Sequence, residues 1–241
     1  KVYTMTLVLM AACSYGFAVT HHSIGMDDTA IPLYFEDGVA PYVGRWSLFV
    51  INRVLHIHIS DFAPWMMELL SVSILMVSVT LWCVLWKRIC EPKVVLPTWN
   101  YLFAAGMFLT CPLISEVFVF YLHNGICTGY GLTALALLCL LESLSSGSGK
   151  RQQARHLLLS SILLTVALGF YESFMIVFMI GGVMAFSLMR RLYGKEERAG
   201  GYSPRVLPWM RGGFLSCAGS LLMRTVMLAV LGKAYNLQAL E

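Results

Sequence analysis

The stretch Leu157–Met189, LLLSSILLTVALGFYESFMIVFMIGGVMAFSLM, decides the fold. It is 33 residues long, whereas about 20 mostly apolar residues are enough for a helix to cross a bilayer. The polar corner Gly169–Ser173 interrupts the stretch near its middle. It therefore predicts two short helices that meet at this corner, and such a pair indicates a polytopic membrane protein.

Five further apolar stretches extend this pattern over the whole chain. They are Val2–Val19, Trp65–Trp86, Trp99–Leu122, Ile126–Leu144 and Gly212–Gly232. Pro112 breaks the third of them, and Arg224 lies inside the last. We therefore expect an all-α membrane protein with about seven transmembrane helices, forming a single domain over residues 1–241.

The composition agrees with this fold class. Of the 241 residues, 58% are hydrophobic and only 12% are charged, against about 25% charged residues in soluble domains. A disordered chain, an average cytosolic enzyme and a basic nucleic-acid-binding domain are therefore excluded, and no nucleic-acid partner is expected. The chain is expected to contact membrane lipids instead.

The basic residues predict the orientation, because cytoplasmic loops are enriched in Lys and Arg. The cytoplasmic set, Lys1 with the segments Lys87–Lys93, Ser145–His156 and Arg190–Arg211, holds 13 of the 17 basic residues. Of the 13 acidic residues, 9 fall outside or in the outer half of a helix. This separation places the long polar loop, residues 20–64, outside the cytoplasm.

The external loop concentrates ionisable side chains. It contains the acidic pair Asp27-Asp28, and its second half, Arg45–Ser60, has helical periodicity. Arg45, Asn52, His56 and Ser60 form one polar stripe on that helix, whereas apolar residues that include Trp46 cover much of the remainder. The loop is thus expected to contain an amphipathic helix in the membrane interface.

Three charged residues lie within predicted membrane helices. Each of Glu116, Glu172 and Arg224 is unfavourable by about 2.5–3.5 kcal/mol if it reaches the bilayer centre. Such groups pair or line a wet cavity, and all three are expected to converge beneath the external loop. A structural salt bridge of Arg224 with Glu116 or Glu172 is the alternative to a substrate role.

Carboxylates above a membrane cavity that also contains arginine suit sugar transfer from a polyprenyl-phosphate donor. A carboxylate, Asp27 or Asp28, would take the proton of the acceptor hydroxyl, and Arg45 would hold the departing phosphate. The other candidate substrate-binding residues are Trp46, Arg53, His56, Glu116, Tyr171, Glu172 and Arg224. No D-x-D triplet occurs, so a divalent metal is optional, and no residue is assigned as its ligand.

The order of short motifs resembles a known family. Gly25–Asp28 (GMDD) follows the first helix, Gly44-Arg45-Trp46 comes next, and Tyr171-Glu172 is similar to a Tyr-Gln element, with Glu in place of Gln. Together they resemble the GT-C class of membrane glycosyltransferases, in particular the bactoprenol-dependent O-antigen glucosyltransferases (Gtr-type) of bacteria.

The resemblance implies a GT-C-like fold in the bacterial inner membrane, with a catalytic Asp (Asp27 or Asp28) in the first periplasmic loop. It further implies an undecaprenyl-phosphate-glucose donor and a surface polysaccharide acceptor. Members of that family are generally longer, so the chain is expected to be truncated at its C-terminus.

Two other functions remain open from the sequence. A transporter or flippase of lipid-linked sugars would use Glu116, Glu172 and Arg224 along its path and Leu157–Met189 as a discontinuous helix. A non-catalytic scaffold would instead leave Asp27, Asp28 and Arg45 pointing apart into solvent.

Overall fold

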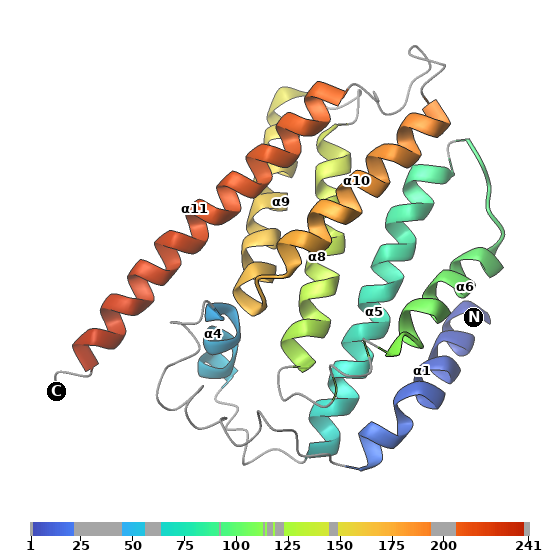
Figure 1. The fold of residues 1–241 in the computed structure, drawn as a ribbon, viewed down its shortest axis with the longest axis horizontal. Coiled ribbons are helices and arrows are strands. Elements are labelled where there is room, and N and C mark those ends of the chain that lie inside the picture. Colours follow the sequence, from blue (N-terminus) through green and yellow to red (C-terminus); the bar gives the residue numbers. More distant parts are fainter. Residues whose placement is uncertain are drawn as a thin grey trace.

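The computed structural model describes residues 2–21, 45–55, 64–91, 93–112, 114, 118, 123–144, 149–193 and 206–238. Within these residues the regular elements are helices and no strand is present. The helices are α1 (Val2–Thr20), α4 (Trp46–Leu55), α5 (Pro64–Cys90), α6 (Thr98–Leu109), α8 (His123–Ser143), α9 (Lys150–Phe170), α10 (Phe174–Tyr193) and α11 (Val206–Gln238) (Figure 1). The predicted all-α class is confirmed.

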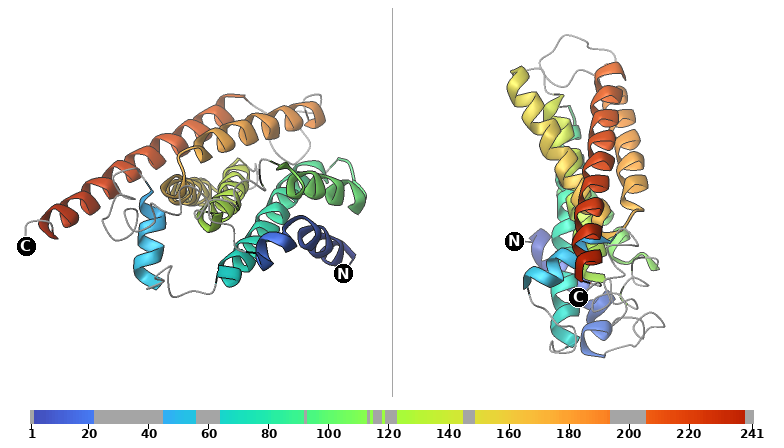
Figure 2. Two further views of the ribbon diagram at one scale, coloured as in Figure 1. Left: turned by 60° about the horizontal axis from the view of Figure 1, so that its bottom comes forward. Right: turned by 90° about the vertical axis from the view of Figure 1, so that its left-hand side faces the viewer.

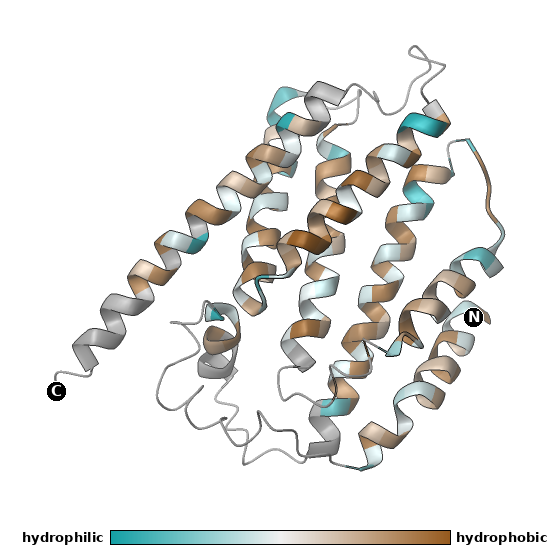
Figure 3. Ribbon diagram, viewed as in Figure 1, coloured by the Kyte–Doolittle hydropathy of each residue, from teal (hydrophilic) through white to brown (hydrophobic). Residues whose placement is uncertain are grey.

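Six of the described helices are long and apolar enough to cross a membrane: α1, α5, α8, α9, α10 and α11. Their surfaces carry many exposed apolar side chains, such as Phe214 and Val183. Hydrophobic residues recur along the length of these helices, with few strongly hydrophilic residues between them (Figure 3). Because lipid, unlike water, solvates such surfaces, the protein is a polytopic membrane protein.

The predicted span Trp99–Leu122 differs from expectation. Helix α6 has only 12 residues and ends at Leu109. Both the backbone N–H and the side-chain hydroxyl of Thr110 bond to the carbonyl of Gly106, and Pro112 follows two residues later. Since proline lacks an N–H donor and clashes with the preceding turn, a continuous helix through residue 112 is unfavourable.

The predicted pair of helices on either side of the polar corner is confirmed, but the two helices are not short. Helix α9 has 21 residues and α10 has 20. Helix α9 begins at Lys150, seven residues before the apolar stretch. Its first two turns consist mainly of polar residues, so a prediction from apolar residues alone leaves them out. Each helix is therefore a complete span.

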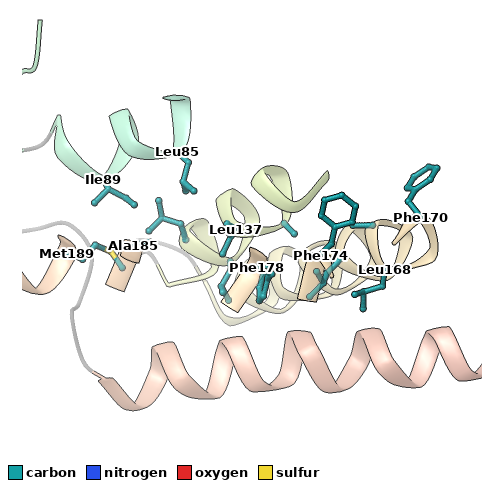
Figure 4. Packing of buried hydrophobic residues seen from close by; sticks show 14 of the residues in the cluster. Leu85, Ile89, Leu137, Leu168, Phe170, Phe174, Phe178, Ala185 and Met189 are labelled. Atoms are coloured by element: carbon teal, nitrogen blue, oxygen red, sulfur yellow. The ribbon is translucent and has the colours of Figure 1, made fainter. Parts of the chain in front are cut away.

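Helix α8 lies at the centre of the bundle and packs against α5, α9 and α10. Its Leu137 belongs to one buried cluster that also contains Leu85 of α5, Leu168 of α9 and Phe178 of α10 (Figure 4). A second cluster joins α1, α5 and α6, where the hydroxyl of Tyr15 donates to the Leu109 carbonyl at 2.7 Å. Helices α10 and α11 lie on one side of α8 and α9 (Figure 2).

The two ends of the bundle differ in charge. Helix α4, the C-terminal end of α1, the N-terminal ends of α5 and α8, and the α9–α10 corner share one end, called here the corner end (Figure 1). The opposite end holds Lys87 and Arg88 in the last turn of α5, Arg190 and Arg191 in the last turn of α10, and Lys150 at the start of α9. The segregation of basic residues expected from the sequence is thus present in three dimensions.

Candidate functional site

Helix α4 and the residue before it bring Arg45 and Trp46 to the C-terminal end of α9. The Ser47 hydroxyl donates a hydrogen bond to the Val166 carbonyl at 2.8 Å, and the Trp46 side chain is buried beside it, with 6% of the residue exposed. The amphipathic helix predicted over Arg45–Ser60 is therefore present from Trp46 to Leu55. The buried face of α4 packs on α9, whereas the sequence predicted only a contact with the membrane interface.

Gly169 makes this docking sterically feasible. A Cβ atom at this position would lie 2.1 Å from Ser47 Oγ and 2.5 Å from Trp46 Cε2. Both distances are far inside van der Waals contact, so any larger residue would force α4 away from α9. Sequence reasoning missed Gly169 and Ser47 as site-forming residues; the position of Gly169 at the edge of the polar corner was the available signal.

Arg45 lies over the ring of Tyr171. Its Cζ atom is 5.0 Å from the ring centroid, which is within the range of a cation–π interaction. Tyr171 is the first residue after α9 and has an extended backbone, with φ −157° and ψ 132°. Because the helix ends there, the Tyr171 ring can reach the residue that immediately precedes α4.

Glu172, the next residue, forms an ion pair with Arg224 of α11. Arg224 Nη2 donates to Glu172 Oε1, so the salt bridge that the sequence offered as an alternative is present. The two side chains differ in exposure, at 21% for Arg224 and 60% for Glu172. The carboxylate is thus the more accessible member, and the guanidinium is the more enclosed one.

Two buried N–H groups near this corner have no hydrogen-bond acceptor among the described residues. They are the indole Nε1 of Trp46 and the Nε of Arg224. Buried polar groups are nearly always hydrogen-bonded in folded proteins. Each of these two donors therefore lacks an acceptor that the described residues supply.

Five of the predicted site residues therefore gather at the corner end: Arg45, Trp46, Tyr171, Glu172 and Arg224. The backbone of Arg53 lies in α4, and its side chain is outside the described residues. Asp27, Asp28, His56 and Glu116 also lie outside them. The catalytic carboxylate thus stays a prediction from the sequence, whereas the arginine part of the site is described.

An apolar crevice of about 310 Å³ opens between α5, α6 and α10. Its lining includes Trp82 and Trp86 of α5, Phe108 of α6, and Tyr130 of α8. The Tyr130 ring also meets the ring of Phe174, the first residue of α10, with centroids 5.3 Å apart. The crevice is therefore linked through Phe174 to the Tyr171–Glu172 corner.

Within the described residues, no group of three or more His, Cys, Asp or Glu side chains is placed to hold a metal ion.

A family described as "Glucosyl transferase GtrII" matches residues 16–237, which is most of the chain. No curated protein and no solved structure gives a significant match.

Proposed function

The chain belongs to the glucosyl transferase GtrII family, and we propose that it transfers glucose from a polyprenyl-phosphate donor to a cell-surface polysaccharide. The observation that carries this proposal is the meeting of two arginines at one corner: Arg45 over Tyr171 and Arg224 beside Glu172. The family supplies the glucosyl transfer, and these residues supply the reason for a phosphate-linked donor.

The two arginines suit the leaving group of such a donor. A guanidinium presents parallel N–H donors that match two phosphate oxygens, which a lysine ammonium cannot do with the same geometry. The departing polyprenyl phosphate gains negative charge as its bond to the sugar breaks, so cations placed beforehand stabilise the transition state more than the ground state. The unpartnered Nε of Arg224 adds a further donor.

The base in this proposal is Asp27 or Asp28. The acceptor hydroxyl oxygen forms a bond to the anomeric carbon of glucose while its proton passes to the carboxylate. The bond between that carbon and the phosphate oxygen breaks, and its electron pair leaves with the polyprenyl phosphate. Because a phosphate leaves readily, no separate general acid is required.

The charge distribution supports a site on the extracytoplasmic face of the bacterial inner membrane. Basic residues such as Arg88 and Arg191 gather at the end of the bundle opposite the site. Cytoplasmic segments carry the excess of Lys and Arg in membrane proteins. The corner end would then face the periplasm, where the sugar and phosphate of the donor lie at headgroup level and the apolar crevice offers a surface for its lipid chain.

The test is a transfer assay on the purified full chain in nanodiscs, with radiolabelled undecaprenyl-phosphate-glucose and bacterial polysaccharide acceptors, with and without chelator. Label is expected to move to the polysaccharide. The double variant Asp27→Asn, Asp28→Asn is expected to abolish transfer, whereas Asp37→Asn, in the same loop, is the matched control. Full transfer by the double variant would remove the proposed base.

The same donor in sealed vesicles separates a transferase from a flippase. A flippase moves the intact donor between leaflets, whereas a transferase consumes it. The discontinuous helix that favoured transport in the sequence is two complete helices, α9 and α10, so the structure gives transport no specific support.

A further inference from the structure

Helices α9 and α11 meet through side-chain hydroxyls. Both helices run toward the corner end (Figure 1), so they are parallel neighbours. The hydroxyl residues at their contact are Ser160, Ser161 and Thr165 on α9 and Ser216 and Ser220 on α11, and all five are buried. We call this set the hydroxyl seam.

The first contact of the seam links three helices. Ser160 Oγ donates to the Ala136 carbonyl of α8 at 2.8 Å, and its oxygen lies 3.0 Å from Ser216 Oγ. Because the Ser160 hydrogen is already used, Ser216 is the donor in the second bond. A chain of hydrogen bonds therefore runs from α11 through α9 to the central helix α8.

The second contact lies one turn further toward the corner end. Ser220 Oγ is 2.6 Å from the Ser216 carbonyl of its own helix and 3.1 Å from the Ser161 carbonyl of α9. Thr165 Oγ1 is likewise 2.7 Å from the Ser161 carbonyl of its own helix and 3.3 Å from the Ser220 carbonyl of α11. A Cβ added at Gly219 would lie 3.3 Å from Ser161 Oγ. The backbones of the two helices thus approach closely here, and a larger residue at position 219 has little room.

The same face of α11 carries Arg224. Gly212, Ser216, Ser220 and Arg224 are spaced four residues apart, so they follow one another along one side of the helix, about 6 Å apart. Residues that pair between two parallel helices keep nearly the same separation in sequence. The separation is 56 residues for Ser160–Ser216 and 52 residues for Glu172–Arg224, so the alignment at the seam continues to the Tyr171–Glu172 corner.

The seam has to set this alignment because most of the other α11 side chains that the structure describes are poorly buried. Phe214 and Leu222, for example, are 73% and 67% exposed. In lipid, apolar side chains gain little by moving from one helix neighbour to another, so close packing of small residues and interhelical hydrogen bonds decide how helices associate. A slip of α11 by one turn would move Arg224 by about 5.4 Å, which is enough to break its pair with Glu172.

We propose that Ser216, Gly219 and Ser220 are positioning residues that hold Arg224 beside Glu172. They touch neither the donor nor the acceptor, and they act through the placement of α11 along α9. The positioning itself follows from the contacts above. Its consequence for sugar transfer rests on the proposed function.

The first test measures position without activity. Glu172→Cys and Arg224→Cys are combined in a chain whose seven native cysteines are replaced, and a short thiol-specific cross-linker is added. Gly219→Val is then introduced, with Gly213→Val as the matched control, because a Cβ at Gly213 meets nothing within 4 Å. Gly219→Val is expected to slow cross-linking at least about threefold, and Gly213→Val is expected to leave it unchanged.

Equal cross-linking rates in the Gly219→Val and Gly213→Val chains would overturn the proposal. If Gly219→Val does not fold, Gly219→Ala and Ser216→Ala take its place, with Gly213→Ala as control. Each of these smaller changes disturbs the seam less than Gly219→Val does. Each is still expected to slow cross-linking relative to Gly213→Ala, and equal rates would again overturn the proposal.

The second test uses the native cysteines and the KM for undecaprenyl-phosphate-glucose. Gly219→Val is expected to raise this KM in the wild-type chain and to have no further effect in an Arg224→Gln chain, because both changes remove the same interaction. Additive effects would contradict positioning through Arg224. If Arg224→Gln leaves this KM unchanged while the cross-linking result holds, Arg224 is removed from donor binding and the positioning stands. If the wild-type chain transfers no glucose while the cross-linking result holds, the proposed function fails and the positioning stands.

Discussion

The change Gly169→Ala tests whether α4 holds Arg45 in the site. The new Cβ would lie 2.1 Å from Ser47 Oγ, 2.5 Å from Trp46 Cε2 and 2.8 Å from Trp46 Nε1. Both partners are buried, so neither side chain has free space to turn into. The added methyl group is therefore expected to displace α4 from the end of α9 while the span of α9 stays intact.

The magnitude follows from overpacking and from the lost contacts. Inserting one methyl group into a packed core is unfavourable by about 1–3 kcal/mol, and displacement of α4 also breaks the bond from Ser47 to the Val166 carbonyl. A local change of about 1–3 kcal/mol corresponds to about 5- to 150-fold more frequent opening of α4. Arg45, directly before α4, would leave the Tyr171 ring at the same time.

Hydrogen exchange followed by mass spectrometry measures this opening. Peptides covering residues 46–55 are expected to lose protection by that factor in Gly169→Ala, while peptides from the centre of α8 keep theirs. The matched control is Gly16→Ala in α1, where a Cβ meets nothing within 4 Å. Unchanged protection of residues 46–55 in Gly169→Ala would refute the docking of α4 on Gly169.

Three further changes test the arginines and separate the site from the fold. Arg45→Lys is expected to raise the KM for the polyprenyl-phosphate donor about tenfold in the transfer assay, because lysine loses the bidentate phosphate geometry; an unchanged KM would remove Arg45 from donor binding. Glu172→Gln is expected to lower the Tm in detergent by a few degrees and to do so more than Arg224→Gln. The reason is that Glu172→Gln leaves the enclosed Arg224 guanidinium without its charged partner. A larger loss of Tm in Arg224→Gln would contradict this explanation. Tyr15→Phe removes a buried hydrogen bond to Leu109 and is expected to reduce stability by about 1 kcal/mol with transfer unchanged, whereas lost transfer in a stable variant would link α1 to the site.

The parts of the fold that could be predicted are those governed by the length and polarity of single segments. The polar corner inside Leu157–Met189 predicted the turn between α9 and α10, because a stretch that is too long for one crossing has to turn where it becomes polar. The grouping of Arg45, Tyr171, Glu172 and Arg224 was also predictable in outline. Their segments are predicted to end on the same side of the bilayer, and charges in lipid seek partners.

The parts that could not be predicted depend on contacts between helices. At the end of α6 the Cys111 N–H bonds to the Phe108 carbonyl, three residues back, just before Pro112. Hydropathy, which continues beyond that point, does not show this change. Gly169 is a small residue among many in the sequence, and only the docked α4 shows that a Cβ is excluded there. The partners of Ser216 and Ser220 likewise require the relative placement of α9 and α11, which no periodicity in one helix contains.

The described part of the site depends on one short platform, residues 166–172 at the end of α9. Val166 accepts the bond from Ser47, Tyr171 lies under Arg45, and Glu172 binds Arg224. The two arginines therefore come from opposite ends of the chain to the same few residues, so their separation depends on how rigidly this platform is held.

Rigidity at this platform comes from the centre of the bundle. Leu164 and Leu168 of α9 are fully buried in the cluster formed with α8, and Ser160 is bonded to the Ala136 carbonyl. A side chain packed on such a helix keeps its place more precisely than one on a free loop. The contacts that Arg45 and Arg224 make with Tyr171 and Glu172 are thus supported by the α8–α9 core, and such support is the preorganisation that the proposed stabilisation of a departing phosphate requires.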